Sequence, residues 1–433
     1  MERTLISELK NNIGKEVLLK GWIQELRDLS KIKFIILRDR SGDMQTLAFQ
    51  GDTEQETFDS IKDYTKESVL ELVGLVKENK TSRWGIEVMI KNAKLISKAE
   101  TPLPIDNTDK SETNIDKRID FRFLDTRNLN KQAIFKVRGK ISKILTNFLD
   151  DQGFTNINTP KITTLGVESG AELFNVDYFG KKICLSQSPQ IYKQMFVAGG
   201  FERVYEIGPI FRAEKSNTTR HLTEFTGVDF EMGFINDYTD IMDMIDNMFK
   251  NLLTNLSEEA KDELKTLGVE LQVPKEIPRI TMEEAKKILA SKGKQYTRED
   301  DLDSEGEKLL GAYVKEKYNS EFVFVTEFPW EVRPFYHMMS SKNTTKSFDL
   351  LFNGVEICTG AQREHNFETL KKQAKEKGLD MAEMEKYAEI FRFGIPPHGG
   401  VGFGLDRITQ RLLGKENVRE AVLLPRDPDR MSP

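Results

Sequence analysis

The stretch from Phe211 to Met232, FRAEKSNTTRHLTEFTGVDFEM, places arginine, histidine and carboxylate side chains on a strand-like pattern. Its first part supplies Arg212 and Glu214, its Ser-Asn-Thr-Thr middle has the composition of a loop, and its last part alternates like a returning strand. A hairpin with arginines in these places is suited to binding phosphate groups. The alternative is a salt-bridged surface hairpin, which is where mixed charges on a hairpin usually lie.

A second group of polar residues lies in the run SFDLLFNGVEICTGAQREH. The pattern predicts adjacent strands, and the residues expected close together on them or at their ends are Asp349, Glu356, Thr359 and Arg363. Two carboxylates near an arginine that binds phosphate favour a hard cation with oxygen ligands, such as Mg²⁺.

Three other segments carry candidate residues. Gln190 and Lys193 begin a predicted helix and lie three residues apart, so both could face one pocket, although a single helix lysine is usually solvated. Glu168 stands between glycines in the loop Thr163–Phe174, where it could approach a small ligand or be a solvated acid. The glycine-rich run before the predicted helix 405–413 has neither P-loop nor dinucleotide-binding spacing.

Composition sets the limits for these groups. At 433 residues the chain should form two or three domains, and 38% hydrophobic with 31% charged residues is typical of a soluble globular protein. The N-terminus lacks the apolar core of a signal peptide and no run is apolar enough to span a membrane, so we expect a cytoplasmic protein. Two cysteines, Cys184 and Cys358, exclude a disulfide framework. A net charge of −6 still allows a local basic face that binds nucleic acid.

Residues 16–97 predict five short strands with a helix-like stretch, Thr53–Tyr64, between the third and fourth. This is the pattern of an OB-fold, a small barrel that binds oligonucleotides on one face. A barrel with another ligand is the alternative. Phe34 and Gln45 would lie on adjacent strands, where one could stack on a base and the other could bind its edge, although Phe34 could equally belong to the core.

The rest of the chain predicts a second, larger domain. Residues 99–118 are rich in proline and polar residues and form a linker. A long amphipathic helix follows over Asn130–Asp150, and then a strand that closes at Pro160. The more charged, mainly helical residues 257–318 are typical of an insertion, and nothing alternates in the manner of a doubly wound sheet.

Three segments together resemble motifs 1, 2 and 3 of the class II aminoacyl-tRNA synthetases, in the right order. They are the helix and strand ending at Pro160, FRAE with Arg212, and GFGLDR with Arg407. The details QSPQIYKQ, FRAEKSNTTRHLTEF, RPFYHM and GAQREH are similar to the aspartyl-tRNA synthetases of the archaeal and eukaryotic type. The similarity runs from about Gly21 to the closing LLPRDPDRMSP, so it covers nearly the whole chain.

The resemblance implies an OB-fold anticodon-binding domain at 1–100, a linker or hinge at 101–129 and a class II catalytic domain at 130–433. That catalytic domain is expected to be α+β, with an antiparallel sheet of six to seven strands flanked by helices and a helical insertion at about 257–318. The implied enzyme is an aspartate–tRNA ligase. It would use ATP to convert L-aspartate to aspartyl-adenylate, and then transfer the aspartyl group to the 3′ end of tRNA(Asp).

The resemblance also assigns roles in the ATP site. Arg212 would neutralise the α-phosphate and the attacking carboxylate, and Arg407 would sandwich the adenine against Phe225. These two arginines are the predicted catalytic residues. The remaining predicted ATP contacts are Glu214, Arg220, His221, Leu222, Glu356 and Gly404. The magnesium ligands implied are Glu356, Thr359 and Asp349.

In the aspartate site, Arg363 and Lys193 would face the side-chain carboxylate, with Asp229 supporting them. Glu168 would bind the substrate ammonium group, with Gln190 beside it. The other aspartate contacts implied are Arg212 and Thr359. Asparagine would present its amide donors to a site made of donors and be rejected.

For the anticodon, the resemblance implies that Phe34 stacks on the central base, that Gln45 reads its edge and that Glu87 contacts the first position. Gln24 lies where archaeal relatives separate tRNA(Asp) from tRNA(Asn), and it favours neither outcome clearly. A non-discriminating enzyme would charge both tRNAs with aspartate. The motif 1 helix forms the two-fold interface in relatives, so a homodimer is expected. The alternatives are an asparaginyl-tRNA synthetase and a paralogue that no longer charges tRNA.

Overall fold

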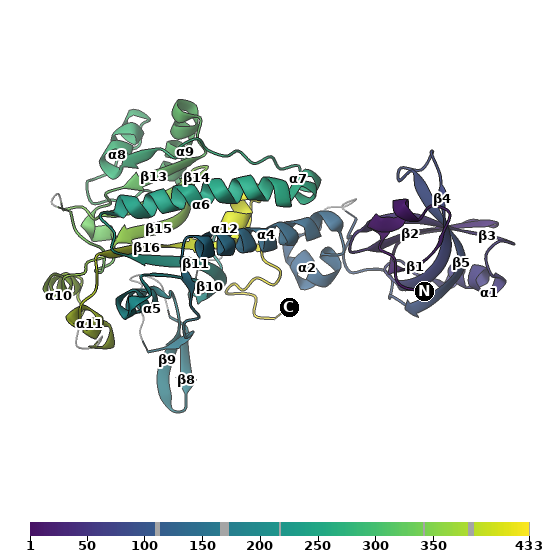
Figure 1. Ribbon diagram of the computed structural model, residues 1–433, viewed down its shortest axis with the longest axis horizontal. Coiled ribbons are helices and arrows are strands. Elements are labelled where there is room, and N and C mark those ends of the chain that lie inside the picture. The colour runs from purple at the N-terminus through teal and green to yellow at the C-terminus, as the bar shows by residue number, and fades with distance from the viewer. Residues whose placement is uncertain (109–112, 165–172, 216–217, 341–342, 380–384, 433) are drawn as a thin grey trace. The chain divides into compact units, whose positions relative to one another are not determined.

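A computed structural model of the chain describes residues 1–108, 113–164, 173–215, 218–340, 343–379 and 385–432. The chain forms two compact units, Met1–Thr113 and Asn114–Pro433. The first is a small barrel of strands, and the second is a broad sheet covered by helices (Figure 1). Among the described residues, no helix has the length and apolar character needed to cross a bilayer.

The first unit is a closed barrel in the order β1-β2-β3-β5-β4. Its strands are β1 (Glu16–Asp28), β2 (Ile32–Asp39), β3 (Gly42–Phe49), β4 (Val69–Glu78) and β5 (Ile86–Ser97). Side chains alternate between the barrel interior and its outer surface, as the period of a strand requires. The short helix α1 (Gln55–Ser60) comes between β3 and β4, which confirms the predicted OB-fold pattern.

The second unit is built on an eight-stranded sheet in the order β12-β13-β14-β15-β16-β11-β10-β6. Six antiparallel strands form its middle: β13 (Phe322–Thr326), β14 (Ser347–Phe352), β15 (Glu356–Gln362), β16 (His398–Gly404), β11 (Glu224–Gly233) and β10 (Arg203–Phe211). The edge strands β12 (Arg279–Thr281) and β6 (Thr155–Asn156) pair in parallel. They raise the count to eight, above the predicted six to seven. The strand β6 lies within the strand predicted before Pro160, whereas β12 lies in a segment predicted to be mainly helical and is too short to show alternation.

Two long helices, α4 (Leu129–Asp151) and α6 (Tyr238–Glu259), lie across one face of this sheet (Figure 1). The side chain of Asn128 caps α4 by accepting hydrogen bonds from backbone N–H groups of its first turn. Apolar residues of both helices share one core with the sheet, where the ring centroids of Phe249 and Phe403 are 5.8 Å apart. The helix α4 is therefore the predicted amphipathic helix, one residue longer at each end.

The other elements surround this core. Helices α5, α10 and α11 lie on the side of the sheet opposite α4 and α6, together with a small sheet in the order β7-β9-β8 (Figure 1). Their bounds are α5 (Gln190–Phe196), α10 (Phe367–Glu376), α11 (Glu385–Arg392), β7 (Ile162–Thr163), β8 (Asn175–Tyr178) and β9 (Lys181–Leu185). The remaining α-helices of about two turns or more among the described residues are α7 (Lys261–Leu267), α8 (Met282–Ser291), α9 (Ser304–Tyr318) and α12 (Leu405–Leu412).

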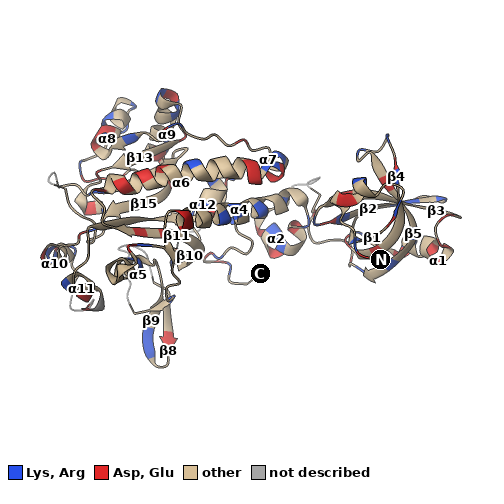
Figure 2. Ribbon diagram, viewed as in Figure 1, with Lys and Arg blue, Asp and Glu red and all other residues tan. Residues whose placement is uncertain are grey.

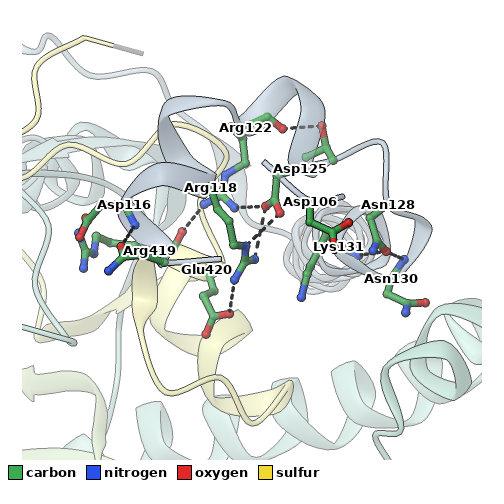
Figure 3. Close-up of polar contacts among 12 residues, drawn as sticks. Asp106, Asp116, Arg118, Arg122, Asp125, Asn128, Asn130, Lys131, Arg419 and Glu420 are labelled. Carbon is green, nitrogen blue, oxygen red and sulfur yellow. Dashed lines mark hydrogen bonds and ion pairs between the residues drawn. The ribbon is translucent and has the colours of Figure 1, made fainter. Parts of the chain in front are cut away.

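A buried arginine joins the start of the second unit to its end. Arg122 lies in α3 (Arg122–Asp125), which follows α2 (Ile115–Asp120). Its Nη1 donates to Asp125 Oδ2 at 2.8 Å, and its other nitrogens donate to the carbonyl oxygens of Arg419 at 2.8 Å and Leu423 at 3.0 Å. Figure 3 shows how Arg122, Asp125 and Arg419 lie in this polar cluster. The guanidinium therefore fixes the C-terminal segment to the short helices.

The C-terminal segment in turn holds the hairpin between β10 and β11. The N–H of Val418 donates to the carbonyl of Thr219 at 2.9 Å, and the N–H of Thr223 donates to the carbonyl of Arg426 at 2.9 Å. The two contacts lie on either side of Arg220 and His221, so the segment supports two of the predicted ATP contacts.

We predict that Arg122→Ala lowers the free energy of unfolding by about 2 kcal/mol, because it removes a buried charged donor from the carbonyls of Arg419 and Leu423 and leaves Asp125 with Arg118 as its only arginine partner among the described residues. Urea unfolding followed by circular dichroism measures the loss. Lys117→Ala, at an exposed position of α2, is the matched control and should change stability by less than about 0.5 kcal/mol. Equal stability of the two variants would contradict the role of Arg122 in fixing the C-terminal segment to the short helices.

Candidate active site

A cavity of about 400 Å³ opens in the second unit between the β10–β11 hairpin, β15, β16 and α5. The cavity is lined by the hairpin predicted to bind phosphate and by residues that are far from this hairpin in the sequence. The predicted ATP contacts that line it are Arg212, Glu214, Arg220, His221, Leu222, Phe225, Glu356, Gly404 and Arg407. The predicted amino-acid contacts that line it are Gln190, Lys193, Asp229, Thr359 and Arg363.

The hairpin places Arg212 directly after β10. Its backbone N–H donates to the carbonyl of Thr223 at 2.9 Å, and its guanidinium carbon lies 5.6 Å from the centre of the Phe225 ring. The buried Nε of Arg212 has no hydrogen-bond partner among the described residues, and no carboxylate there forms an ion pair with this side chain. The surface salt-bridge alternative therefore fails at Arg212, whose charge remains available to a ligand.

Arg407 enters the cavity from the first turn of α12. Its Nη1 donates to the backbone carbonyl of Glu356 at 3.1 Å and lies 3.7 Å from the Glu356 carboxylate. The register pairs Gly227 of β11 with Gly404 at the end of β16, so the strand that carries Phe225 lies beside the strand that leads into α12 and Arg407. An aromatic face from β11 and a guanidinium from α12 can hold a flat ring between them.

One buried carboxylate fixes this arrangement. Asp406 accepts hydrogen bonds from Arg138 Nε of α4 at 2.8 Å and from the backbone N–H of Thr226 in β11 at 2.9 Å. The second guanidinium nitrogen of Arg138 also donates to the Thr226 hydroxyl at 2.9 Å. Segments corresponding to all three motifs of the sequence therefore meet at Asp406, next to Arg407, which the sequence predicts to be catalytic.

The amino-acid end of the cavity is built from buried charges. Lys193 Nζ lies 3.0 Å from Asp229 Oδ1, 3.4 Å from Glu231 Oε2 and 3.0 Å from the carbonyl of Val401. Only 2% of the lysine side chain is exposed. The helix α5 thus directs this ammonium group into the sheet, and the solvated alternative for Lys193 does not hold.

Arg363 completes the cluster from the end of β15. Its Nε donates to Glu231 Oε1 at 2.9 Å, its Nη2 to Gln190 Oε1 at 3.2 Å and its Nη1 to His337 Nε2 at 3.0 Å. Because a guanidinium can only donate, Nε2 of His337 must accept and the imidazole must be neutral. Burial, followed by Arg363, places the pKa of His337 well below its ordinary value, in agreement with that tautomer.

Sequence reasoning missed Glu231, which is fully buried between Lys193 and Arg363. Burial by itself would raise the pKa of Glu231, but Arg363 and Lys193 outweigh burial and hold it below its ordinary value. The signal was present, because Asp229 and Glu231 are two residues apart on one strand and so share a face.

The glycine-rich strand β16 makes room for these acids. A Cβ atom at Gly402 would lie 3.0 Å from Asp229 Oδ1, and one at Gly400 would collide with Glu231 Oε2. The glycine-rich run, whose spacing fits neither a P-loop nor a dinucleotide-binding loop, therefore allows β16 to pack closely against the buried carboxylates of β11.

The predicted magnesium ligands are separated in the structure. Glu356 and Thr359 line the cavity, with the Thr359 hydroxyl 3.4 Å from Glu356 Oε1. Asp349 pairs with Thr359 in the strand register, yet its carboxylate accepts from Arg333 Nη2 at 2.7 Å and is absent from the cavity wall. Burial, opposed by Arg333, raises the pKa of Asp349 to about 7. Among the described residues no group of three or more acids, histidines or cysteines could hold a metal ion by itself.

Two further predicted residues have different outcomes. Glu168, predicted to bind the substrate ammonium group, lies outside the described residues. His221 lies 3.7 Å from Glu214 and accepts from or donates to the hydroxyl of Thr218 at 2.7 Å. Burial, then Arg407 and Arg220, lowers the pKa of His221, with Glu214 opposing them.

The predicted anticodon residues lie on the barrel. Phe34 is half-buried on the outer face of β2 and is absent from the barrel core, which excludes the core alternative. Gln45 on β3 donates to Glu87 on β5 at 3.4 Å, so the structure brings these two together. Gln24 sits where the pairing of β1 with β2 shifts register, in a bulge.

Comparison with known proteins agrees with this architecture. The family model described as "tRNA synthetases class II (D, K and N)" matches residues 114–428, and the model described as "OB-fold nucleic acid binding domain" matches residues 17–96. The chain belongs to the class II tRNA synthetases of the D, K and N group, which confirms the resemblance found in the sequence.

Within that group, the chain is similar over nearly its whole length to aspartate–tRNA ligases. The chain is 43% identical over 421 residues to an aspartate–tRNA(Asp/Asn) ligase of Methanopyrus kandleri, covering 97% of this chain and 96% of the relative. It is 43% identical over 423 residues to the aspartate–tRNA(Asp) ligase of Pyrococcus horikoshii, covering 97% of each.

Solved structures are similar over the whole chain. The asparaginyl-tRNA synthetase of Pyrococcus horikoshii complexed with asparaginyl-adenylate has a TM-score of 0.94 at 30% identity, with 100% of both chains covered. An aspartyl-tRNA synthetase of Entamoeba histolytica has a TM-score of 0.91 at 32% identity, covering 100% of this chain and 93% of that one. The fold alone therefore does not separate aspartyl-tRNA synthetases from asparaginyl-tRNA synthetases.

We predict that Glu231→Gln destabilises the second unit by about 3 kcal/mol at neutral pH, because it leaves the buried Lys193 and Arg363 with one carboxylate fewer. The lowered pKa of Glu231 means that its contribution is present above the unfolded-state value and is lost as the pH falls through the folded-state value. Urea unfolding at several pH values should therefore show the difference from the unmodified protein narrowing in acid. Glu258→Gln, at an exposed position of α6, is the control, and an equal effect there would contradict the buried cluster.

Proposed function

We propose that the protein is an aspartate–tRNA ligase that activates L-aspartate with ATP and transfers it to tRNA. The observation that carries the proposal is the composition of one cavity. Arg212, which has no acidic partner among the described residues, shares it with the buried pair Lys193 and Arg363. An arginine without an acidic partner suits a phosphate, and the N–H donors of the buried Lys193 and Arg363 suit the side-chain carboxylate of aspartate.

In the activation step, the aspartate α-carboxylate attacks the α-phosphorus of ATP and pyrophosphate leaves. Arg212 would neutralise the α-phosphate and the carboxylate, which otherwise repel each other. Phe225 and Arg407 would hold the adenine between them, and Arg220 and His221 would meet the far phosphates. This chemistry requires positioning and charge neutralisation more than a protein base, in keeping with a cavity rich in arginine.

The residues present also fit a magnesium ion. Mg²⁺ keeps several waters and binds through one or two protein ligands plus substrate phosphates, so the Glu356 carboxylate and Thr359 hydroxyl would suffice. When bound, the ion would neutralise the charge of the phosphates. Asp349 would join these ligands only if Arg333 released it, because its ion pair with Arg333 is buried.

Selection of aspartate over asparagine would rest on the donors at the amino-acid end. Arg363 and Lys193 offer only N–H groups, which pair with a carboxylate and oppose an amide nitrogen. The neutral His337 accepts from Arg363 and so helps to orient its guanidinium. Sites built to pair with one polar group reject its isostere by about 10⁴-fold or more.

The barrel would bind the anticodon. Phe34 faces outward, where a base could stack on it, and Gln45 and Glu87 already contact each other on neighbouring strands. Lys and Arg are interspersed with Asp and Glu in both units (Figure 2), so local contacts rather than a uniform basic face would hold the tRNA. A homodimer through α4 stays a prediction.

We predict aspartate-dependent ATP–pyrophosphate exchange, with asparagine at least about 10³-fold less effective in kcat/KM. Arg363→Lys should raise the KM for aspartate strongly, because a lysine keeps a positive charge near Glu231 but loses the guanidinium fork. Circular dichroism controls for folding. Exchange that depends on asparagine instead would show an asparaginyl-tRNA synthetase, and folded protein without any exchange would show a non-charging paralogue.

Charging assays with purified transcripts separate the two tRNA specificities. We expect tRNA(Asp) to be aspartylated, and Phe34→Ala to reduce kcat/KM for tRNA about tenfold or more through the loss of one base stack. Exchange without tRNA should be unaffected by that substitution. Aspartylation of tRNA(Asn) at a comparable rate would identify a non-discriminating enzyme, and no charging of either transcript would contradict the proposal.

A further inference from the structure

Arg220, the cavity arginine nearest the far end of the hairpin, is already engaged by a helix outside the three motifs. Its Nη1 donates to the hydroxyl of Ser304 at 3.2 Å and lies 3.5 Å from Glu307 Oε2. Both partners belong to the first turn of α9, in the segment that the sequence marks only as a charged insertion. In this arrangement Arg220 differs from Arg212, which has no such partner among the described residues.

Helix α9 is held firmly in place. Gly354, in the turn between β14 and β15, has φ +68, and a Cβ there would lie 2.7 Å from Lys308 Cα and 2.8 Å from the carbonyl of Glu307. The helix backbone therefore contacts the turn that leads into Glu356. The backbone of Glu307 is therefore fixed by this contact, and its side chain is 15% exposed.

Arg220 has better partners within reach once a nucleotide is present. It lines the cavity together with Arg212 and Arg407, and a guanidinium binds a polyphosphate more strongly than a single carboxyl group. Glu307, by contrast, offers no charged donor to a phosphate and repels it when ionised, although burial and then Glu356 raise the pKa of Glu307 to about 7. The ion pair with Glu307 and the contact with a nucleotide thus compete for one side chain.

We infer that Glu307 is a positioning residue that holds Arg220 against α9 when no nucleotide is bound and yields it to the polyphosphate when ATP binds. The inference rests on the proposed function of the cavity. Its consequence is that the free protein opposes ATP binding by the strength of this contact, while Arg220 stays ordered at the cavity edge. Ser304 supports the same held position through its hydroxyl.

The test is the KM for ATP in aspartate-dependent ATP–pyrophosphate exchange by the full chain. Glu307→Gln should lower this KM about twofold to fivefold with little change in kcat, because a partly exposed ion pair contributes up to about 1 kcal/mol. Ser304→Ala should lower it in the same direction and by less. Glu316→Gln, at an exposed position of the same helix, is the control and should leave the KM unchanged.

A double-mutant cycle separates holding of Arg220 from a general effect on the fold. Arg220→Gln should by itself raise the KM for ATP, and adding Glu307→Gln should then change it less than about 1.5-fold. A structural role for Glu307 would instead move the KM equally in both backgrounds, which would overturn the inference. So would an increase in KM for Glu307→Gln alone, because that would make Glu307 a support for nucleotide binding.

The outcomes also distinguish failure of the proposed function from failure of the proposed role of Glu307. Absence of exchange in the unmodified protein would contradict the proposed function. Normal exchange together with an unchanged KM in both Glu307→Gln and Ser304→Ala would overturn only the role of Glu307.

Discussion

The buried cluster of Lys193, Asp229, Glu231 and Arg363 constrains the rest of the second unit. Burying a charge costs several kcal/mol unless it is paired and its remaining hydrogen-bonding groups are satisfied. Here each cation meets a carboxylate at 3.0 Å or less, and Val401, Gln190 and His337 supply further partners. The cluster needs α5, β11, β15 and β16 together, so the amino-acid end exists only when the sheet is assembled.

The same dependence on assembly is seen at the nucleotide end. Asp406 joins α4, β11 and α12, and thereby fixes the strand and helix that carry Phe225 and Arg407. The glycines of β16 allow the sheet to approach Asp229 and Glu231 closely. Function therefore depends on residues that would not contact a substrate, because they determine where the contacting side chains lie.

Much of the fold follows from local pattern. The barrel strands alternate, α4 has helical spacing and an Asn cap, and the hairpin from Arg203 to Gly233 has strands on both sides of a polar middle. Hydrophobic periodicity and helix capping involve residues that are close in the sequence, so both can be recognised from the sequence alone. The sequence predicted the strand before Pro160 that contains β6 but not its parallel pairing, and it did not predict β12, since the pairing of both edge strands is decided by distant strands.

The sequence by itself determined the residue types of the site, because Arg212, Arg407, Lys193 and Arg363 stand in recognisable motifs. Tertiary structure decided their partners. It gave Lys193 and Arg363 a shared buried Glu231, paired Asp349 with Arg333, and set Arg220 against Glu307 of α9. Ion pairs form between side chains that folding brings within a few ångströms, and sequence separations such as that between Arg363 and Glu231 carry no record of that proximity.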